Sequence, residues 1–191
     1  MNRLARVTSV THNAFKTRST SSIVMSRAAI AISAVSSAVS CIKGRDIRQA
    51  NAQPMSNSLR AIHGINSLTG ATSVGILSLE VLRRRANGED SHRRDLMLME
   101  DANLKTAAIE SGIFICIGAA RLARRGSRKY RYNALGMTTE AIGLAANSYY
   151  FYGLASELVR REKIRWELTR ELESLEWREA NSYQRRHGLY E

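Results

Sequence analysis

The chain contains a single proline, Pro54, in 191 residues. Proline breaks helices because it lacks an amide hydrogen and clashes with the preceding turn. Its near-absence therefore permits helices of twenty residues or more. Val, Ile, Thr and aromatic residues do not gather into the short alternating runs that are typical of strands. We expect an all-α fold.

Four Ala-, Gly- and Ser-rich apolar segments are predicted to form the main helices. They span residues 22–42, 59–82, 104–123 and 134–159. In the first segment, branched aliphatic residues and serines fall on two separate helical stripes. The two stripes are Ile32, Val35, Val39 and Ile42, and Ser33, Ser36, Ser37 and Ser40. One face of this helix thus carries branched aliphatic side chains, and the other carries small hydroxylated side chains.

A long charged helix is expected after the fourth segment and continuous with it. Its leucines recur with near-heptad spacing, at Leu154, Leu158, Leu168, Leu172 and Leu175. Arginines interrupt this stripe at two positions, so a solvated helix with one docked stripe is favoured over a coiled coil. The expected partner-binding surface of this tail comprises Trp166, Leu168, Leu172, Leu175 and Trp177.

Three regions follow from these patterns. Residues 1–21 are basic, contain no acid and are predicted to be a disordered targeting or export segment. A mitochondrial transit peptide, a secretion signal and a plain unstructured terminus fit this composition equally well. Residues 22–162 are predicted to form a four-helix domain, either membrane-associated or a soluble bundle. Residues 163–191 form the charged helical tail.

A short pattern occurs twice, 77 residues apart. Leu77, Glu80, Arg83 and Arg84 match Leu154, Glu157, Arg160 and Arg161. Each copy closes an apolar segment, so the chain is interpreted as two helical hairpins, residues 22–85 and 104–162, that arose by duplication. The alternative is that any helix ending in an arginine pair, which complements the helix dipole, looks like this.

Small residues spaced four apart suggest close helix packing. Such pairs let membrane helices approach one another, and the predicted packing positions are Ala71, Gly75, Gly112 and Gly143. A membrane span needs about 20 mostly apolar residues. Glu110 and Glu140 make the third and fourth segments marginal, because a carboxylate in lipid is costly unless it is paired. A soluble bundle with the same small-residue core is the alternative.

A strongly basic linker joins the third and fourth segments. The whole chain carries a formal net charge of +12, which attracts phosphate on lipids or nucleic acid. The linker contributes Arg121, Arg124, Arg125, Arg128, Lys129 and Arg131. Because it lies between apolar segments, contact with anionic headgroups is favoured over RNA, although nucleic acid remains open as a partner.

No enzymatic, metal or cofactor site is expected. The four histidines are scattered without a Cys or His at ligand spacing. Glu80, Glu110 and Glu140 lie on three segments, but none begins the Glu-x-x-His pattern of di-iron bundles. No phosphate-binding loop or nucleophile elbow occurs either. We expect a protein partner and no small-molecule substrate.

In its general pattern the chain resembles the inclusion-membrane proteins that chlamydiae export into the host vacuole membrane. The resemblance lies in residues 105–120, the loop 121–133, residues 134–159 and the tail "RREKIRWELTRELESLEWREA". It implies a scaffold in a host-facing membrane that recruits partners through its tail. The interrupting Glu110 and Glu140 depart from the family pattern.

The sequence thus favours a non-catalytic, helical, membrane-associated protein that scaffolds or recruits partners through basic loops and a charged tail. The membrane is expected to be a host vacuole or mitochondrial membrane. The alternative is a soluble intracellular basic bundle that binds RNA or an acidic assembly partner as a structural subunit.

Overall fold

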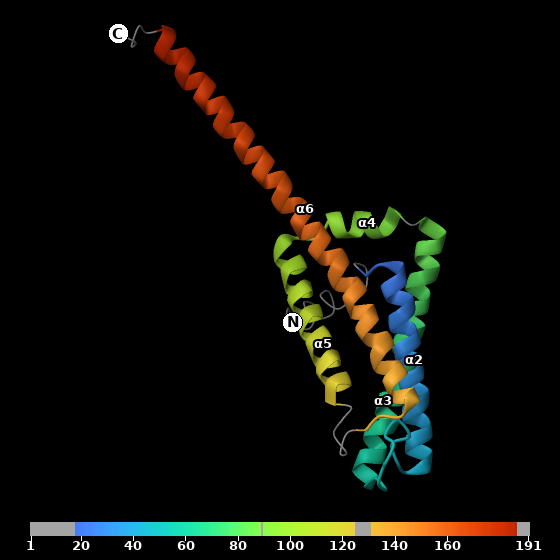
Figure 1. Cartoon of the computed structure of the whole chain (residues 1–191). Helices are drawn as coiled ribbons and strands as arrows, with labels where there is room; N and C mark the ends of the chain where they lie inside the picture. The colour runs from blue at the N-terminus through green and yellow to red at the C-terminus, as the bar shows by residue number, and fades with distance from the viewer. Residues whose placement is uncertain (1–17, 89, 125–130, 187–191) are drawn as a thin grey trace, which may run out of the picture. The chain divides into compact units, whose positions relative to one another are not determined.

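The computed structural model describes residues 18–88, 90–124 and 131–186 (Figure 1). Five helices account for the regular structure of these residues, and the only strand-like pairing among them is an isolated bridge between Gln49 and Tyr132. The expectation of an all-α fold is confirmed. The helices are α2 (Thr20–Lys43), α3 (Asn57–Asn87), α4 (Asp90–Met97), α5 (Asp101–Ala123) and α6 (Ala134–Arg186). Most of the predicted N-terminal segment, residues 1–17, lies outside the described part.

The chain divides into two compact units, the first ending at Leu154 and the second beginning at Ala155. Helix α6 continues from one into the other. The first unit holds α2, α3, α4, α5 and the first part of α6. The second consists of the rest of α6.

Local capping sets the helix boundaries. The side chain of Ser19 accepts a hydrogen bond from the Ser22 amide and begins α2, and Ser56 begins α3 in the same way. These bonds satisfy amide groups that have no partner within the helix. Gly44 ends α2 in the left-handed region, with φ of 66°. Gly88, with φ of 77°, ends α3.

Helix α4 lies between the second and third predicted segments, where no helix was predicted from the sequence. Gly88 stops α3, and a new helix of eight residues starts two positions later. Arg94 lies in its last turn, where a basic residue complements the helix dipole.

In the first unit, α2, α3, α5 and the first part of α6 run alternately up and down (Figure 1). The two linkers 44–56 and 131–133 therefore meet at one end. There the amide of Ala50 donates to the carbonyl of Arg131 at 2.9 Å, and the amide of Asn133 donates to the carbonyl of Arg48 at 3.0 Å. The side-chain amide of Asn133 also donates to the carbonyl of Ile47. These bonds tie the two hairpins together across more than 80 residues of sequence.

The closest helix approach lies between α2 and α3. A Cβ atom built on Gly70 would lie 2.7 Å from the Cβ of Ala34, too close for two carbons. Between α5 and α6, a Cβ on Gly118 would meet Leu144 at 3.4 Å. Glycine at position 70 is what lets α2 and α3 approach this closely, whereas position 118 leaves just enough room for a Cβ atom.

The predicted packing positions are placed differently. Ala71 is exposed, and a Cβ on Gly75 or Gly143 would meet nothing within 4 Å. Only Gly112 has a neighbour, the ring of Phe151, at 3.9 Å. Within the described chain, close packing thus falls on Gly70 rather than Gly75, because spacing alone does not tell which face of a helix meets its neighbour.

Candidate membrane-facing surface, basic end and interhelical cavity

The outer faces of α3 and α5 are covered by large apolar side chains. On α3, Leu68 and Leu79 are 70% and 68% exposed. On α5, Ile109 and Phe114 are 65% and 58% exposed. The remaining exposed aliphatics of these helices include Leu59, Ile62, Ile65, Ile76, Leu82, Ile113 and Ile117. Large apolar side chains are therefore exposed along most of the length of both α3 and α5.

The interior combines buried serines of α2 with a smaller number of large apolar side chains. Ser36 and Ser40 of α2 are 1% and 0% exposed, and Ser22 and Ser37 are equally buried. On the other stripe of the same helix, Val35 and Ile42 point outward. The serine stripe predicted from the sequence thus faces the core. Large aliphatic residues are also buried, at Ile23, Leu77, Leu96, Leu104 and Leu154, but many more of them are exposed in the described residues than a soluble bundle leaves outside.

Several buried and half-buried hydroxyls donate hydrogen bonds to carbonyl groups within the protein. Ser36 donates to the carbonyl of Ile32 at 2.8 Å, and Ser40 donates to that of Ser36 at 2.7 Å. Other hydroxyls connect helices: Ser22 donates to the carbonyl of Ala146 at 2.9 Å, and Ser111 to that of Asn147 at 3.0 Å. Paired hydroxyls of this kind are compatible with an environment that lacks water.

Three helices are long and apolar enough to cross a membrane: Thr20–Lys43, Asn57–Asn87 and Asp101–Ala123. The apolar windows of the second and third are only 6% and 11% buried by the rest of the chain, against 33% for the first. Helix α6, which contains the fourth predicted apolar segment, is not among the membrane-span candidates found in the described residues. Glu140 and the following polar positions lower its apolar content.

The basic linker predicted to contact phosphate lies partly outside the described residues, because Arg125, Arg128 and Lys129 fall there. Arg121 is in the last turn of α5 and forms an ion pair with Glu140 of α6 at 3.5 Å. Arg124 and Arg131 are exposed. The chain reversal that joins Ile47 and Arg48 to Asn133 brings further cations to this end of the unit. They are Lys43, Arg45, Arg48 and Arg60.

A cavity of about 250 Å³ lies between α2, α3, α5 and α6. Its wall is mostly apolar, formed by Ala29, Ile30, Leu77, Phe114 and Ala146 with Gly143, Ser26 and Asn147. Arg18, just before α2, completes the lining. Sequence reasoning missed this site because it grouped Arg18 with the N-terminal segment. Only its position directly before the capping Ser19 hinted that it belongs to the helical unit.

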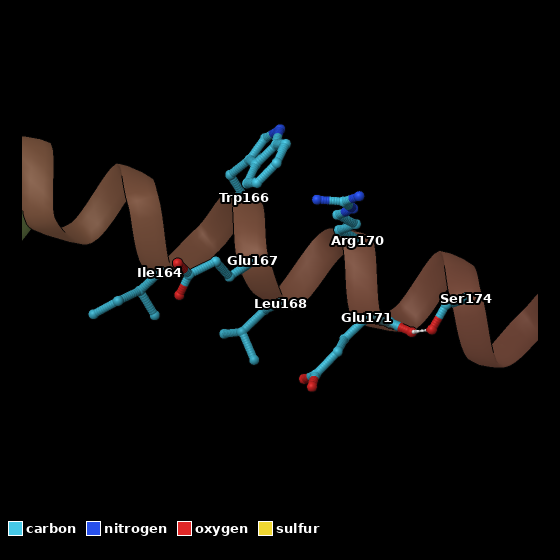
Figure 2. Close-up of a pocket in the computed structure, with 7 residues that line it drawn as sticks. All are labelled: Ile164, Trp166, Glu167, Leu168, Arg170, Glu171 and Ser174. Carbon is cyan, nitrogen blue, oxygen red and sulfur yellow. Dashed lines mark hydrogen bonds between the residues drawn. The ribbon is translucent and has the colours of Figure 1, made fainter.

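The tail residues of α6 lie on two opposite faces. Trp166, Leu168, Leu172, Leu175 and Trp177 are all more than half exposed. With 3.6 residues per turn, Trp166 and Trp177 share one face and the three leucines share the other. Figure 2 shows Trp166 and Arg170 on one side of the helix and Ile164 and Leu168 on the other. The guanidinium of Arg170 stacks over the Trp166 ring at 5.3 Å. The predicted surface is therefore two surfaces, one aliphatic and one aromatic and basic.

The repeated sequence pattern has the same geometry at both places. In α3, Arg83 holds both oxygens of Glu80 at 2.9 Å, and Arg84 donates to one of them at 2.8 Å. In the second unit, the corresponding distances from Glu157 are 2.8 and 2.7 Å to Arg160, and 2.9 Å to Arg161. The leucine three residues before each glutamate, Leu77 or Leu154, is buried.

No group of His, Cys, Asp and Glu side chains that would hold a metal ion occurs in the described residues. No protein-family model matches the chain, and neither a curated protein nor a solved structure is significantly similar to it.

Proposed function

We propose that the chain is a non-catalytic membrane protein in which α2, α3 and α5 lie in the bilayer. The observation that carries this proposal is the apolar outer surface of the first unit. Large aliphatic residues of α3 and α5 face outward, while buried serines of α2 form part of the interior. Monomeric soluble proteins rarely expose extended apolar patches, whereas lipid tails solvate them at no cost.

The soluble alternative fits this arrangement less well. Burying an aliphatic side chain stabilises a soluble bundle by about 1.5–3 kcal/mol. Helix α3 leaves Ile65, Leu68 and Leu79 outside and buries only Leu77 among its large aliphatics. A water-soluble bundle binding RNA or an acidic partner would forgo most of its hydrophobic stabilisation.

The basic end is proposed to contact anionic headgroups. Arg124 and Arg131 are exposed beside the α5–α6 reversal, where an apolar helix ends. A juxtamembrane Lys or Arg contributes about 1 kcal/mol of attraction to an anionic leaflet. Arg121 keeps Glu140 paired, which lowers the cost of a carboxylate at this depth.

The second unit is proposed to recruit a protein partner. Its aliphatic face (Leu168, Leu172 and Leu175) suits the groove of a helical partner, and the acidic and basic residues around it keep the helix soluble alone. The resemblance to inclusion-membrane proteins supports the same role, a scaffold in a host-facing membrane with its tail as the recruiting element.

Duplication of a helical hairpin is part of the proposal. The two Glu–Arg–Arg clusters agree in partner, atom and distance to within about 0.2 Å. A helix end that merely complements its dipole needs neither a buried leucine nor a doubly held carboxylate at fixed spacing, which supports a common origin of the two copies.

Membrane residence is tested by alkaline carbonate extraction and vesicle flotation of the full chain. We expect the protein to stay in the pellet and to float with vesicles. Leu68→Arg places a charge on the exposed face of α3 and costs about 2.5–3.5 kcal/mol at a bilayer centre, so insertion should fall sharply. Leu172→Arg, at a tail leucine that is 60% exposed against 70% for Leu68, is the matched control and should float normally. Complete release of the unmodified chain by carbonate would refute the proposal.

A further inference from the structure

The cavity of the first unit combines a mostly apolar wall with one half-buried cationic side chain, that of Arg18. Arg18 donates from Nη1 to the hydroxyl of Ser26 at 3.0 Å, and its guanidinium stacks over the ring of Tyr150 at 4.5 Å. These two contacts fix the side chain against α2 and α6. Its Nε is shielded from solvent and has no hydrogen-bond partner in the described residues. Other atoms of Arg18 line the cavity, so the cavity has a positioned guanidinium in its wall.

The positive charge of Arg18 also has no acidic partner in the cavity. None of the nine residues that line it is acidic. The segment before Arg18 brings none either, because the first acidic residue of the sequence is Asp46. Burial lowers the pKa of Arg18, but a guanidinium stays protonated in proteins. A buried charge is costly without a partner, so a bound anion would relieve that cost.

We propose that this cavity binds an anionic amphiphile, with its acidic head on Arg18 and its apolar chain along Leu77, Ile30 and Phe114. Charge-assisted bonds from a guanidinium to a carboxylate or phosphate are among the stronger hydrogen bonds in proteins. An apolar cavity of about 150 Å³ is large enough for benzene. The larger cavity here suits part of one acyl chain and is too small for a whole two-chain lipid.

Gly143 provides a way to fill the cavity without disturbing Arg18. It lines the wall, and a Cβ built on it would meet nothing within 4 Å. A leucine at this position extends into open space and suits a helix better than glycine does. Gly143→Leu is therefore expected to fold normally and to exclude the chain of the ligand.

Equilibrium binding to the full chain, purified in a neutral sugar-headed detergent, tests the proposal. The probes are radiolabelled dodecanoate, the dodecanoyl form of lysophosphatidic acid, and dodecanol as the uncharged analogue. We expect one acidic probe to bind per chain and dodecanol to bind at least about tenfold more weakly. Stronger binding of dodecanoate identifies a free fatty acid as the natural class, and stronger binding of the phosphate probe identifies a lipid headgroup.

Three variants separate the two halves of the site. Arg18→Gln should weaken binding of the acidic probes by about ten- to a hundredfold, as expected for loss of a charged hydrogen bond, and leave dodecanol unchanged. Gly143→Leu should abolish binding of all three probes. Gly143→Ala, a smaller insertion, should give a partial loss. Arg27→Gln removes a charge from α2 outside the lining and should behave like the unmodified chain.

Several results would overturn the proposal. They are equal affinity for dodecanol and dodecanoate, unchanged binding by Arg18→Gln, and unchanged binding by a helical Gly143→Leu. This outcome is separable from membrane residence. If carbonate releases the chain but it still binds dodecanoate, membrane residence is refuted and the ligand site is supported. If the chain floats with vesicles but binds neither acidic probe, membrane residence is supported and the ligand site is refuted.

Discussion

The contact between α2 and α3 makes a quantitative prediction at Gly70. A Cβ at this position would lie 2.7 Å from the Cβ of Ala34, and 3.4 Å from its Cα. The clash involves a backbone atom and a methyl group that cannot rotate away, so the helices must separate. Overpacking of this kind costs about 1–3 kcal/mol. Replacing glycine by alanine within a helix stabilises the helix by up to about 1 kcal/mol, which offsets part of this cost.

Gly75→Ala is the matched control for Gly70→Ala. It lies on the same helix, and its added Cβ meets open space. The helix-propensity gain is common to both variants, so the difference between them isolates the clash, about 1–3 kcal/mol. In a chain of this size that corresponds to a melting temperature lower by roughly 3–9 °C for Gly70→Ala than for Gly75→Ala.

Thermal unfolding in detergent, followed by circular dichroism at 222 nm, measures this difference. A second substitution, Ala34→Gly, removes the opposing methyl group and should recover part of the loss in the Gly70→Ala background. Equal melting temperatures for Gly70→Ala and Gly75→Ala would refute the α2–α3 contact described above. Stabilisation by Gly70→Ala together with destabilisation by Gly75→Ala would place the helix contact on the other face.

Three further predictions follow. Asn133→Ala removes the acceptor for the Gly136 amide and the donor that joins the two linkers, and should destabilise the chain by about 1–2 kcal/mol in thermal unfolding; Asn133→Asp, which keeps the acceptor, should lose less. Burial lowers the pKa of His92 from its ordinary 6.5, so the unfolded chain takes up a proton first. Stability is then full above pH 6.5 and falls as the pH drops through the lowered value, a dependence that His92→Gln should flatten in melting curves from pH 5 to 8. A photo-crosslinking residue at Leu172 should give a discrete partner adduct, whereas one at Trp177, on the opposite face, should not; the reverse pattern would move the partner to the aromatic face.

Much of the helical architecture follows from sequence pattern. The absence of proline after Pro54 and the continuous run of helix-forming residues account for α6, which extends unbroken over 53 residues. The spacing of serines in α2 predicted a serine stripe, and two of its members, Ser36 and Ser40, are buried. Periodicity does not predict which face of a helix is buried. Helix α2 has both a serine stripe and an aliphatic stripe, and only its packing against α3 shows which of the two faces inward.

The candidate site was less accessible to sequence reasoning. Small residues spaced four apart occur along several faces, and the spacing selected Gly75 where the structure uses Gly70. The cavity joins Arg18 to Leu77 and Phe114, residues far apart in the sequence. Because such a site depends on the arrangement of four helices, no local sequence motif predicts it. The division of the tail into two faces, by contrast, was derivable from helical geometry alone.

The local bonding of the α2 hydroxyls bears on how the protein is made. Ser36 and Ser40 each donate to a carbonyl of their own helix, so neither needs a neighbouring helix to avoid a lone polar group in oil. In the proposed bilayer location, α2, which is synthesised before α3, α5 and α6, would enter the membrane as a solitary helix. Assembly of the first unit would then be a later, separate event in which the serine face of α2 packs against each following helix.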